Sequence, residues 1–332
     1  MKIVINQTMT ISSPPHIYGT GSIEKRMRDV LIALSPAFVF AVYHYGFRSL
    51  FITAVSVMSA MLAEYLFQKV KGKTPTINDC SAAITGVLLA FNLPPGVPFW
   101  LPIIGSFFAV IVVKQLFGGL GANFMNPALA ARAFLLVSFP VHMTNWRLPD
   151  VVSGVSPAHA DALSSATYLG ILQQNPDFTP QLFDYMAVLF GKVGGCIGET
   201  SAAALIAGGI YLLVRRVINW RIPVFYIGSF ALFAFLFGRT GFLSGHILFE
   251  VLAGGLLMGA FFMATDYSTS PISLNGKIVF GIGCGFLTAV IRIYGGYPEG
   301  VSYAIIIMNL FVPLIDKYIR PRVYGHAKGR KA

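Results

Sequence analysis

The residues best suited to covalent chemistry lie in one polar segment, Asp161-Ala-Leu-Ser-Ser-Ala-Thr167. The small side chains of Ser165 and Ala166 leave the hydroxyl of Thr167 sterically open to modification. The same small and hydroxyl-bearing residues are also typical of a helix cap or a turn. Composition alone favours the cap, so a chemical role for Thr167 needs support from the rest of the chain.

Neither the cysteines nor any common nucleotide-binding motif provides a second candidate site in the sequence. Cys80, Cys196 and Cys284 are far apart in the chain, and no CxxC or Cys/His cluster is present. This spacing favours buried, apolar cysteines over a disulfide or a metal site. The chain also has no Walker A loop and no GxGxxG after a strand. We therefore expect neither a metal site nor a nicotinamide-nucleotide site.

The composition indicates an integral membrane protein. Of the 332 residues, 55% are hydrophobic and 11% are charged, whereas soluble domains are about 25% charged. The mean hydropathy is +0.70. The chain also holds 34 Gly and 19 Pro, which are more frequent in membrane helices than in soluble ones. Residues 1–29 lack the apolar core and cleavage site of a signal peptide, so we expect the first apolar segment to be an uncleaved span.

Apolar segments recur along the chain and predict an all-α, polytopic membrane protein of about ten transmembrane helices. Several segments are short, which implies tilting or local thinning of the bilayer. The predicted regions are a cytoplasmic arm (1–29), a first membrane repeat (30–140), an extracytoplasmic loop (141–183), a second membrane repeat (184–319) and a basic cytoplasmic tail (320–332). The segments are Val30–Phe47, Ser49–Val70, Cys80–Leu93, Pro98–Leu116, Asn126–Pro140, Lys192–Val214, Ile222–Gly238, His246–Thr265, Lys277–Arg292 and Val301–Ile319.

The positions of the basic residues predict the orientation of these spans. With the N-terminus inside, 18 of the 24 Lys and Arg residues fall in predicted inner regions, as the positive-inside rule requires. Both termini are therefore predicted to be cytoplasmic and the 141–183 loop to be outside. The net charge of +11 then reflects topology and contact with anionic lipid head groups, and it does not indicate nucleic-acid binding.

The two halves of the chain are weakly similar. In the first half, Ala90-Phe-Asn-Leu-Pro-Pro95 precedes a segment that ends in Lys114-Gln-Leu-Phe-Gly-Gly119. In the second, Ala264-Thr-Asp-Tyr-Ser-Thr-Ser-Pro271 precedes a segment that ends in Arg292-Ile-Tyr-Gly-Gly296. We expect two inverted five-helix repeats with broken helices at their cores, a common plan in transport proteins. The alternative is that Pro- and Gly-containing loops look alike without duplication.

The polar segment around Thr167 resembles the D-x-x-S-x-A-T motif recognised by flavin transferases. These enzymes take FMN from FAD and join its phosphate to the threonine hydroxyl as a phosphoester. Asp161, Ser164, Ala166 and Thr167 occupy the defining positions. The motif is often followed by Pro, and here Tyr168 follows; it could stack on a flavin ring or simply pack against a neighbour. The resemblance implies covalent FMN on Thr167.

Three further stretches resemble the D subunit of the Rnf ion-translocating oxidoreductases, and together they argue against a chance match of the short motif. They are Asn123-Phe-Met-Asn-Pro-Ala-Leu-Ala-Ala-Arg132, Met263-Ala-Thr-Asp-Tyr-Ser-Thr-Ser-Pro271 and Ile291-Arg-Ile-Tyr-Gly-Gly-Tyr-Pro-Glu299. The resemblance covers roughly residues 20–320. The B subunit of the sodium-translocating NADH:quinone reductase has the same plan but is usually longer at its N-terminus, so the Rnf D subunit is the better match.

This resemblance implies a membrane subunit of a redox-driven ion pump in the cell inner membrane. Its partners would be the A, B, C, E and G subunits of the complex, and a flavin transferase would mature it. The whole complex would move electrons between reduced ferredoxin and NAD and couple them to Na⁺ or H⁺ movement. The chain itself would supply no nucleotide-binding active site.

Ionisable groups within or near the spans are candidates for an ion path, because a charge inside a bilayer is costly. Most of them lie near segment ends, where snorkelling or capping accounts for them. Asn92 and Asp266 stand out because they lie at the equivalent breaks of the apparent repeat, where we expect a shared central cavity. A second, non-covalent flavin, a quinone or an ion could occupy it. The full set is Glu64, Lys114, Arg132, Glu199, Glu250, Asp266 and Arg292.

Two functions from other classes fit part of the sequence. A channel or secondary transporter of urea-transporter-like architecture would share the five-plus-five plan and the broken helices, without a redox role. A purely structural scaffold subunit would share the spans alone. The flavinylation motif discriminates, because neither alternative has a use for it.

Overall fold

The computed structural model describes residues 23–146, 167–175, 180–191, 194–238, 246–296 and 299–319. Throughout these ranges the regular elements are helices, which confirms the predicted all-α class. The elements of the first part are α1 (Ile23–Tyr45), α2 (Phe47–Val70), η1 (Ile77–Asp79), α3 (Ser81–Phe91), α4 (Trp100–Phe107), the π-helix η2 (Phe108–Gln115), α5 (Pro127–Ser138) and α6 (Pro140–Met143).

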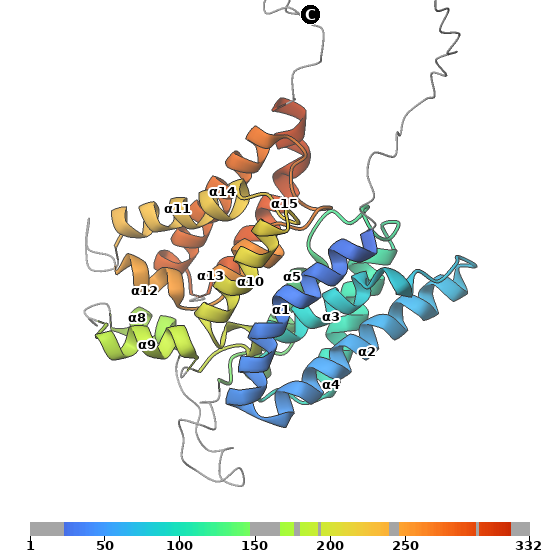
Figure 1. Cartoon of the computed structure of the whole chain (residues 1–332), viewed down its shortest axis with the longest axis horizontal. Coiled ribbons are helices and arrows are strands. Elements are labelled where there is room, and N and C mark those ends of the chain that lie inside the picture. The colour runs from blue at the N-terminus through green and yellow to red at the C-terminus, as the bar shows by residue number, and fades with distance from the viewer. Residues whose placement is uncertain are drawn as a thin grey trace, which may run out of the picture.

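The second part begins with two short helices and continues with longer ones (Figure 1). Its elements are α8 (Tyr168–Gln174), α9 (Leu182–Phe190), η4 (Ile197–Glu199), α10 (Ala202–Val214), α11 (Arg221–Leu236), α12 (Ile247–Leu252), α13 (Leu256–Met258), the π-helix η5 (Gly259–Met263), α14 (Leu274–Tyr294) and α15 (Val301–Tyr318).

Four helices, α1, α2, α14 and α15, are long and apolar enough to cross a membrane. Shorter apolar helices accompany them: α3, the continuous run of α4 and η2, α5, α10 and α11. This set of helices is that of a polytopic membrane protein. The predicted segment His246–Thr265 is not one helix, since it divides into α12, α13 and η5 with a turn at Gly254, whose φ is +71°. The chain therefore breaks inside this segment, at Gly254, as well as after its end at Thr265.

Close helix packing in both halves depends on glycine. A Cβ atom on Gly86 of α3 would lie 2.7 Å from the Cα of Val57 in α2. A Cβ atom on Gly285 of α14 would lie 2.7 Å from the backbone N of Phe230 in α11. Small residues at such crossings let helix backbones approach closely, which is how membrane helices associate without a hydrophobic driving force.

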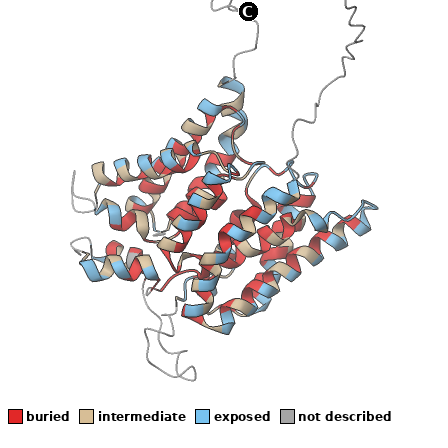
Figure 2. Ribbon diagram, viewed as in Figure 1, coloured by how far each residue is buried: buried red, intermediate tan, exposed pale blue. Residues whose placement is uncertain are grey.

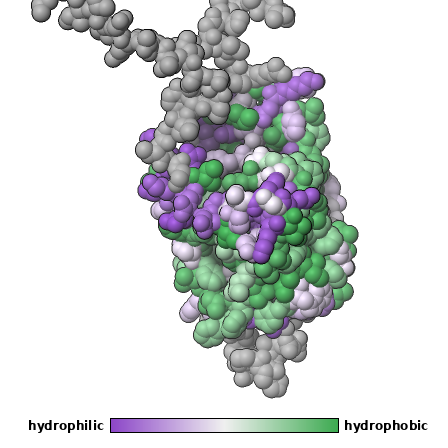
Figure 3. Space-filling view, turned by 90° about the vertical axis from the view of Figure 1, so that its right-hand side faces the viewer, coloured by the Kyte–Doolittle hydropathy of each residue, from purple (hydrophilic) through white to green (hydrophobic). Residues whose placement is uncertain are grey.

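Burial follows one face of most helices, and the buried faces meet in the interior (Figure 2). The outward faces are apolar: Met58 on α2 is 70% exposed and Leu310 on α15 is 53% exposed. Figure 3 shows hydrophobic residues covering most of one side of the molecule, with hydrophilic residues gathered towards its upper end. An apolar outer surface is stable when lipid surrounds it, in agreement with the composition.

The first long helix begins, and the last long helix ends, on the same side of the molecule. In Figure 1 the start of α1 and the end of α15 lie towards the top, whereas α8 and α9 lie at the lower left. The short helices α8 and α9 are thus remote from both of these helix ends. An ion pair between Asp29 of α1 and Arg215 just after α10, at 3.2 Å, joins the two halves near the start of α1.

Candidate functional site

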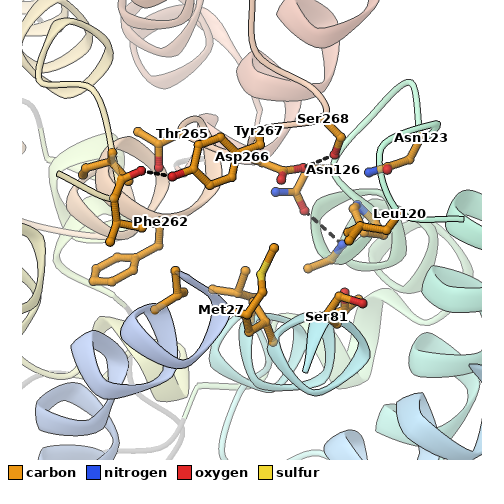
Figure 4. Close-up of a pocket in the computed structure, with 18 of the residues that line it drawn as sticks. Met27, Ser81, Leu120, Asn123, Asn126, Phe262, Thr265, Asp266, Tyr267 and Ser268 are labelled. Atoms are coloured by element: carbon orange, nitrogen blue, oxygen red, sulfur yellow. Dashed lines mark hydrogen bonds between the residues drawn. The ribbon is translucent and has the colours of Figure 1, made fainter. Parts of the chain in front are cut away.

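A chamber with a volume of about 90 Å³ lies between α1, α3, α5 and the segment that follows η5 (Figure 4). We call it the inner chamber. The break after η5 contributes to its wall, because residues 265–268 leave the helix there. Its polar lining consists of Ser81, Thr85, Lys114, Asn123, Asn126, Thr265, Asp266 and Ser268.

Asn126 holds two helix ends together at this chamber. Its side-chain oxygen accepts hydrogen bonds from the backbone N–H groups of Ala128 at 3.0 Å and Leu129 at 3.3 Å, so it caps α5. Its amide nitrogen donates to the backbone oxygen of Met263, the last residue of η5, at 3.2 Å. Asn followed by Pro is a favourable start for a helix. The Asn123–Arg132 stretch singled out in the sequence is therefore a structural junction as well as a chamber wall.

Asp266 lies in the inner chamber, as expected for a cavity residue. The hydroxyls of Ser268 and Thr269 donate to its Oδ2 at 3.0 and 3.3 Å. Desolvation raises the pKa of the Asp266 carboxyl above its usual value, and these two hydrogen bonds offset part of that rise. The group is placed to bind a proton or a cation from the chamber.

A larger cavity of about 530 Å³, which we call the vestibule, shares Met27, Leu120, Asp266, Tyr267 and Ser268 with the inner chamber. Tyr267 lies on this boundary. Its hydroxyl donates to the backbone oxygen of Val217, and the guanidinium of Arg26 lies 5.5 Å from its ring centre. The vestibule and the inner chamber therefore form one adjoining space, reached from the side on which α1 begins.

A buried ion pair closes one wall of the inner chamber. The Lys114 ammonium lies 2.9 Å from Glu64 Oε1 and donates to the Ser81 hydroxyl at 2.6 Å. Gln115 donates to the same carboxylate at 2.6 Å. Lys114 and Gln115 end the π-helix η2, a type of element that is frequent at functional sites. The sequence indicated Glu64 and Lys114 only as separate charges.

A second charged cluster lies on the side of α8, and we call it the outer cluster. Its centre is Arg132 of α5, which is 6% exposed. The guanidinium donates to the Asn92 side-chain oxygen at 3.1 Å and to the Ser302 hydroxyl at 2.9 Å. It also forms an ion pair with Glu299. The two halves of the chain therefore meet at this arginine.

Arg292 of α14 adds a fully buried guanidinium next to this cluster. It donates to the backbone oxygens of Glu250 at 2.6 Å, Ala253 at 3.4 Å and Glu299 at 3.2 Å. Its guanidinium carbon lies 4.9 Å from the ring centre of Phe230. Arg292 thereby satisfies carbonyl groups that the break after α12 leaves without helical partners.

Thr167 lines a small pocket of about 30 Å³ together with Glu199 and Glu299. This outer pocket lies beside the outer cluster. Thr167 is the N-cap of α8: its hydroxyl accepts a hydrogen bond from the Gly170 N–H at 3.1 Å. The residue is 9% exposed, so its hydroxyl is not as open as expected, because the cap packs against the rest of the protein. Asp161, Ser164 and Ala166 lie outside the described residues.

The expectation that Asn92 and Asp266 line a shared central cavity stays a prediction, and the two residues lie in different surroundings. Asp266 lines the inner chamber, whereas Asn92 follows α3 and binds Arg132 in the outer cluster. The sequence paired them because both follow a helix break.

Two members of the outer cluster, Cys196 and Glu299, were not among the residues that the sequence singled out as sites. The cysteine sulfur, one carboxylate oxygen of Glu199 and one of Glu299 lie within 4.8 Å of one another. Three such groups can hold a metal ion, but the Arg132 guanidinium already contacts Glu299 and lies 3.6 Å from the Cys196 sulfur. A guanidinium there fills the role of a cation. The only hint in the sequence was the position of Glu299 at the end of a singled-out stretch.

Comparison with known proteins gives matches over almost the whole chain. A sequence model of the NQR2, RnfD, RnfE family matches residues 10–325. The chain is 46% identical to the D subunit of the Na(+)-translocating ferredoxin:NAD(+) oxidoreductase complex of Acetobacterium woodii, over 97% of each chain. It is 44% identical to the D subunit of the proton-translocating ferredoxin:NAD(+) oxidoreductase complex of Clostridium ljungdahlii, over 95% of this chain and 96% of that protein. It is 37% identical to the D subunit of the ion-translocating oxidoreductase complex of Halorhodospira halophila, over 95% of each.

Proposed function

The chain belongs to the NQR2, RnfD, RnfE family, and on that premise we propose that it is the D-type membrane subunit of an Rnf-type, redox-driven ion pump. It passes electrons within a complex that exchanges them between reduced ferredoxin and NAD and translocates Na⁺ or H⁺. Relatives are named for each of these ions, so the proposal covers both. Its partners are the other subunits of that complex, A, B, C, E and G.

The membrane part is proposed to be two inverted five-helix repeats in the cell inner membrane. Several features support this plan. Glycine-mediated packing of α3 on α2 has a counterpart in α14 on α11. A π-helix interrupts each half, η2 in the first and η5 in the second. The start of α1 and the end of α15 lie on the same side of the molecule (Figure 1), in agreement with two cytoplasmic termini.

Thr167 is proposed to carry FMN through a phosphoester bond, and the observation that carries this proposal is the complete D-x-x-S-x-A-T motif at Asp161, Ser164, Ala166 and Thr167. Bound FMN supplies the redox chemistry, while the protein supplies position and electrostatics. The outer pocket has room for about two water molecules. It suits the attachment point and not the flavin ring system, which would lie outside it.

The chain's own residues fit an attached phosphate in two respects. The Thr167 side chain is held by the α8 cap, which limits where the attached group starts. Two guanidinium groups, those of Arg132 and Arg292, belong to the charged surroundings of the outer pocket through Glu199 and Glu299. They offset the negative charge that two carboxyl groups and a phosphoester would otherwise accumulate.

The test separates the cap from the nucleophile. Asn caps a helix as well as Thr does but cannot form the phosphoester, so Thr167→Asn should yield a folded protein whose band in a denaturing gel is dark under ultraviolet light. Wild type expressed with its flavin transferase should fluoresce, and Thr167→Ser should retain part of the signal. Equal fluorescence in wild type and Thr167→Asn would refute the assignment, as would a dark wild type.

The inner chamber and vestibule are proposed to hold a second, non-covalent flavin. The observation that favours this is their combination of apolar walls with the amide group of Asn123 at one edge, whose oxygen has no hydrogen-bond partner among the described residues (Figure 4). Flavin released by denaturation from purified Thr167→Asn protein measures this site alone. If correctly folded Thr167→Asn protein released no flavin, a second flavin in these two cavities would be excluded.

The rival function is a channel or secondary transporter. It predicts ion flux through the reconstituted chain without any electron donor. Flux that appears only when the assembled complex turns over favours the redox pump, and flux through the isolated chain favours the rival.

A further inference from the structure

Three arginines lie in and beside the short connection between α10 and α11. Residues 215–221 are Arg-Arg-Val-Ile-Asn-Trp-Arg, with no acidic residue among them. We call this segment the arginine turn. Arg215 and Arg216 are exposed, and Arg221 is partly exposed. The turn lies near the start of α1, because Arg215 forms the ion pair with Asp29 described above.

The backbone of the arginine turn has a conformation that suits glycine better than arginine. The N–H of Val217 donates to the backbone oxygen of Leu212 at 2.9 Å, and the N–H of Arg216 donates to that of Leu213 at 3.0 Å. These two bonds form a Schellman motif, which ends a helix and favours glycine at its left-handed position. Arg216 occupies that position, with a φ of +55°. Because a side chain costs free energy in this conformation, the turn itself does not require an arginine there.

Most of the positive charge of the arginine turn is not neutralised within the chain. The Asp29 carboxylate lies 3.2 Å from the Arg215 guanidinium. Neither Arg216 nor Arg221 forms an ion pair within the part of the chain that the structure describes. These two guanidinium groups are therefore available to an anion from outside the chain.

Two further cations come from neighbouring helices. Arg26 of α1 lies 5.5 Å from the ring centre of Tyr267, whose hydroxyl donates to the backbone oxygen of Val217 in the turn. Lys277 is in the first turn of α14, and α14 packs closely against Ile222 of α11 one turn later. Positive charge from α1, α10, α11 and α14 therefore gathers around the arginine turn.

Apolar side chains flank these charges on the outer surface. Val214 and Trp220 on either side of the turn are exposed, as are Ile210 on α10 and Val224 on α11. The guanidinium carbon of Arg221 lies 5.2 Å from the ring centre of Trp220. An exposed Trp beside basic residues is typical of the boundary between membrane and water. The turn thus presents cations and apolar contacts next to each other.

We propose that the arginine turn binds the head group of an anionic phospholipid of the surrounding membrane. Arg216 and Arg221 attract the phosphate, since a planar guanidinium offers several N–H donors to phosphate oxygens. Trp220 and the exposed aliphatic side chains contact the acyl chains near the head group.

The apolar neighbours are the reason for choosing a lipid. Clusters of Lys and Arg next to membrane helices attract anionic lipids. A soluble anion or an acidic protein surface would use the charges but not the exposed apolar side chains beside them. The proposal does not rest on the flavin attachment or on the redox function proposed above.

The test measures the melting temperature of the purified protein in an uncharged detergent. Phosphatidylglycerol should raise it more than phosphatidylcholine does, and inorganic phosphate at the same concentration should not raise it. Arg216→Gly should melt at or above the wild-type temperature without lipid, because glycine suits the left-handed backbone, yet it should gain less from phosphatidylglycerol. Arg221→Gln should also gain less. The double variant should gain no more from phosphatidylglycerol than from phosphatidylcholine.

Lys71→Gln with Lys73→Gln is the matched control, since it removes two exposed cations that follow α2. It should keep the wild-type gain from phosphatidylglycerol. An equal reduction in this control and in the double arginine variant would mean that only general surface charge acts, and would overturn the site. A wild type without preference for phosphatidylglycerol, or with an equal response to inorganic phosphate, would overturn it as well.

Native mass spectrometry provides a second measurement. Wild type released from detergent should retain phosphatidylglycerol, and the double arginine variant should lose it under the same conditions. Retention by both proteins would contradict the assignment of this lipid to the arginine turn.

Discussion

At the scale of single residues, the observed role of Thr167 and its proposed role use the same oxygen. As an N-cap it accepts a hydrogen bond from Gly170, and as the proposed attachment point it forms an ester through that hydroxyl. An ester oxygen can still accept a hydrogen bond, so the two roles are compatible. The cap interpretation and the modification interpretation of the sequence are therefore not exclusive.

Removing the cap should destabilise the protein measurably. Thr167→Ala should lower the free energy of unfolding by about 1 kcal/mol, because one helix N–H loses its partner. Thr167→Asn, compared in the same flavin-free background, should lie within about 0.5 kcal/mol of wild type. Unfolding in mixed micelles measures both values. No loss in the Ala variant would show that α8 does not depend on this cap.

Arg292 is the residue whose loss should be most damaging. Arg292→Met keeps much of the volume but leaves the carbonyl groups of Glu250 and Ala253 without this donor, whereas the Glu299 oxygen still accepts from the Val301 N–H. Each unsatisfied buried group costs about 1 to 3 kcal/mol, so we expect a loss of at least about 2 kcal/mol or failure to accumulate. Arg221→Met, at the start of α11, is the control and should be nearly neutral. A stable Arg292→Met protein would contradict the proposed role of this guanidinium.

At the scale of helices, glycine decides how closely α11 and α14 approach. Gly285→Ala would place a methyl group against the backbone of Tyr226 and Phe230, so the two helices must separate. We expect a loss of about 1 to 3 kcal/mol from this overpacking.

Gly228 on α11 offers the matched control, since nothing lies within 4 Å of a Cβ atom there. Gly228→Ala should be neutral or stabilise the helix by up to about 1 kcal/mol. Thermal unfolding of the two variants side by side checks the prediction. Equal effects would mean that the crossing is not set by Gly285.

At the scale of the whole molecule, topology can be measured with single cysteines in a Cys80→Ser background. Cys196 and Cys284 are buried and should stay unreactive. Asn145→Cys should react with a membrane-impermeant thiol reagent in intact cells, after permeabilisation of an outer membrane where one is present. Gly329→Cys should react only after lysis. The reverse pattern would contradict the predicted outside location of the 141–183 loop.

Asp266 links the inner chamber to the behaviour of the whole protein. Because its carboxyl pKa is raised on folding, the folded state binds the proton more tightly, and stability falls as pH rises above the ordinary value of 3.8. Asp266→Asn removes this penalty. We expect a higher melting temperature at neutral pH, no difference from wild type below the ordinary pKa, and normal Thr167 fluorescence.

The same variant should impair ion-coupled electron transfer, because Asn cannot exchange a proton or offer a negative charge to a cation in the chamber. Electron transfer and ion uptake by the assembled complex in proteoliposomes measure this effect. Normal coupling at normal assembly would remove Asp266 from the candidate ion path.

The amino-acid sequence by itself determined the class of the molecule, because composition and hydrophobic length depend only on local residue content. Basic residues beside the spans likewise predicted their orientation, and the short motif pointed to Thr167. The sequence could not predict the turn at Gly254, which lies inside a predicted span. This turn packs against Leu169 and Arg292, which come from distant parts of the chain.

Only the tertiary structure decided which charges act together. Asn92 and Asp266 looked equivalent along the chain, yet one binds Arg132 and the other lines the inner chamber. Glu199 and Glu299 are far apart in the sequence and lie within 4.8 Å of Cys196 and of each other. Hydrophobic pattern specifies that a helix is buried and on which face, but ion pairing depends on distances between helices, and these follow from packing that no local pattern contains.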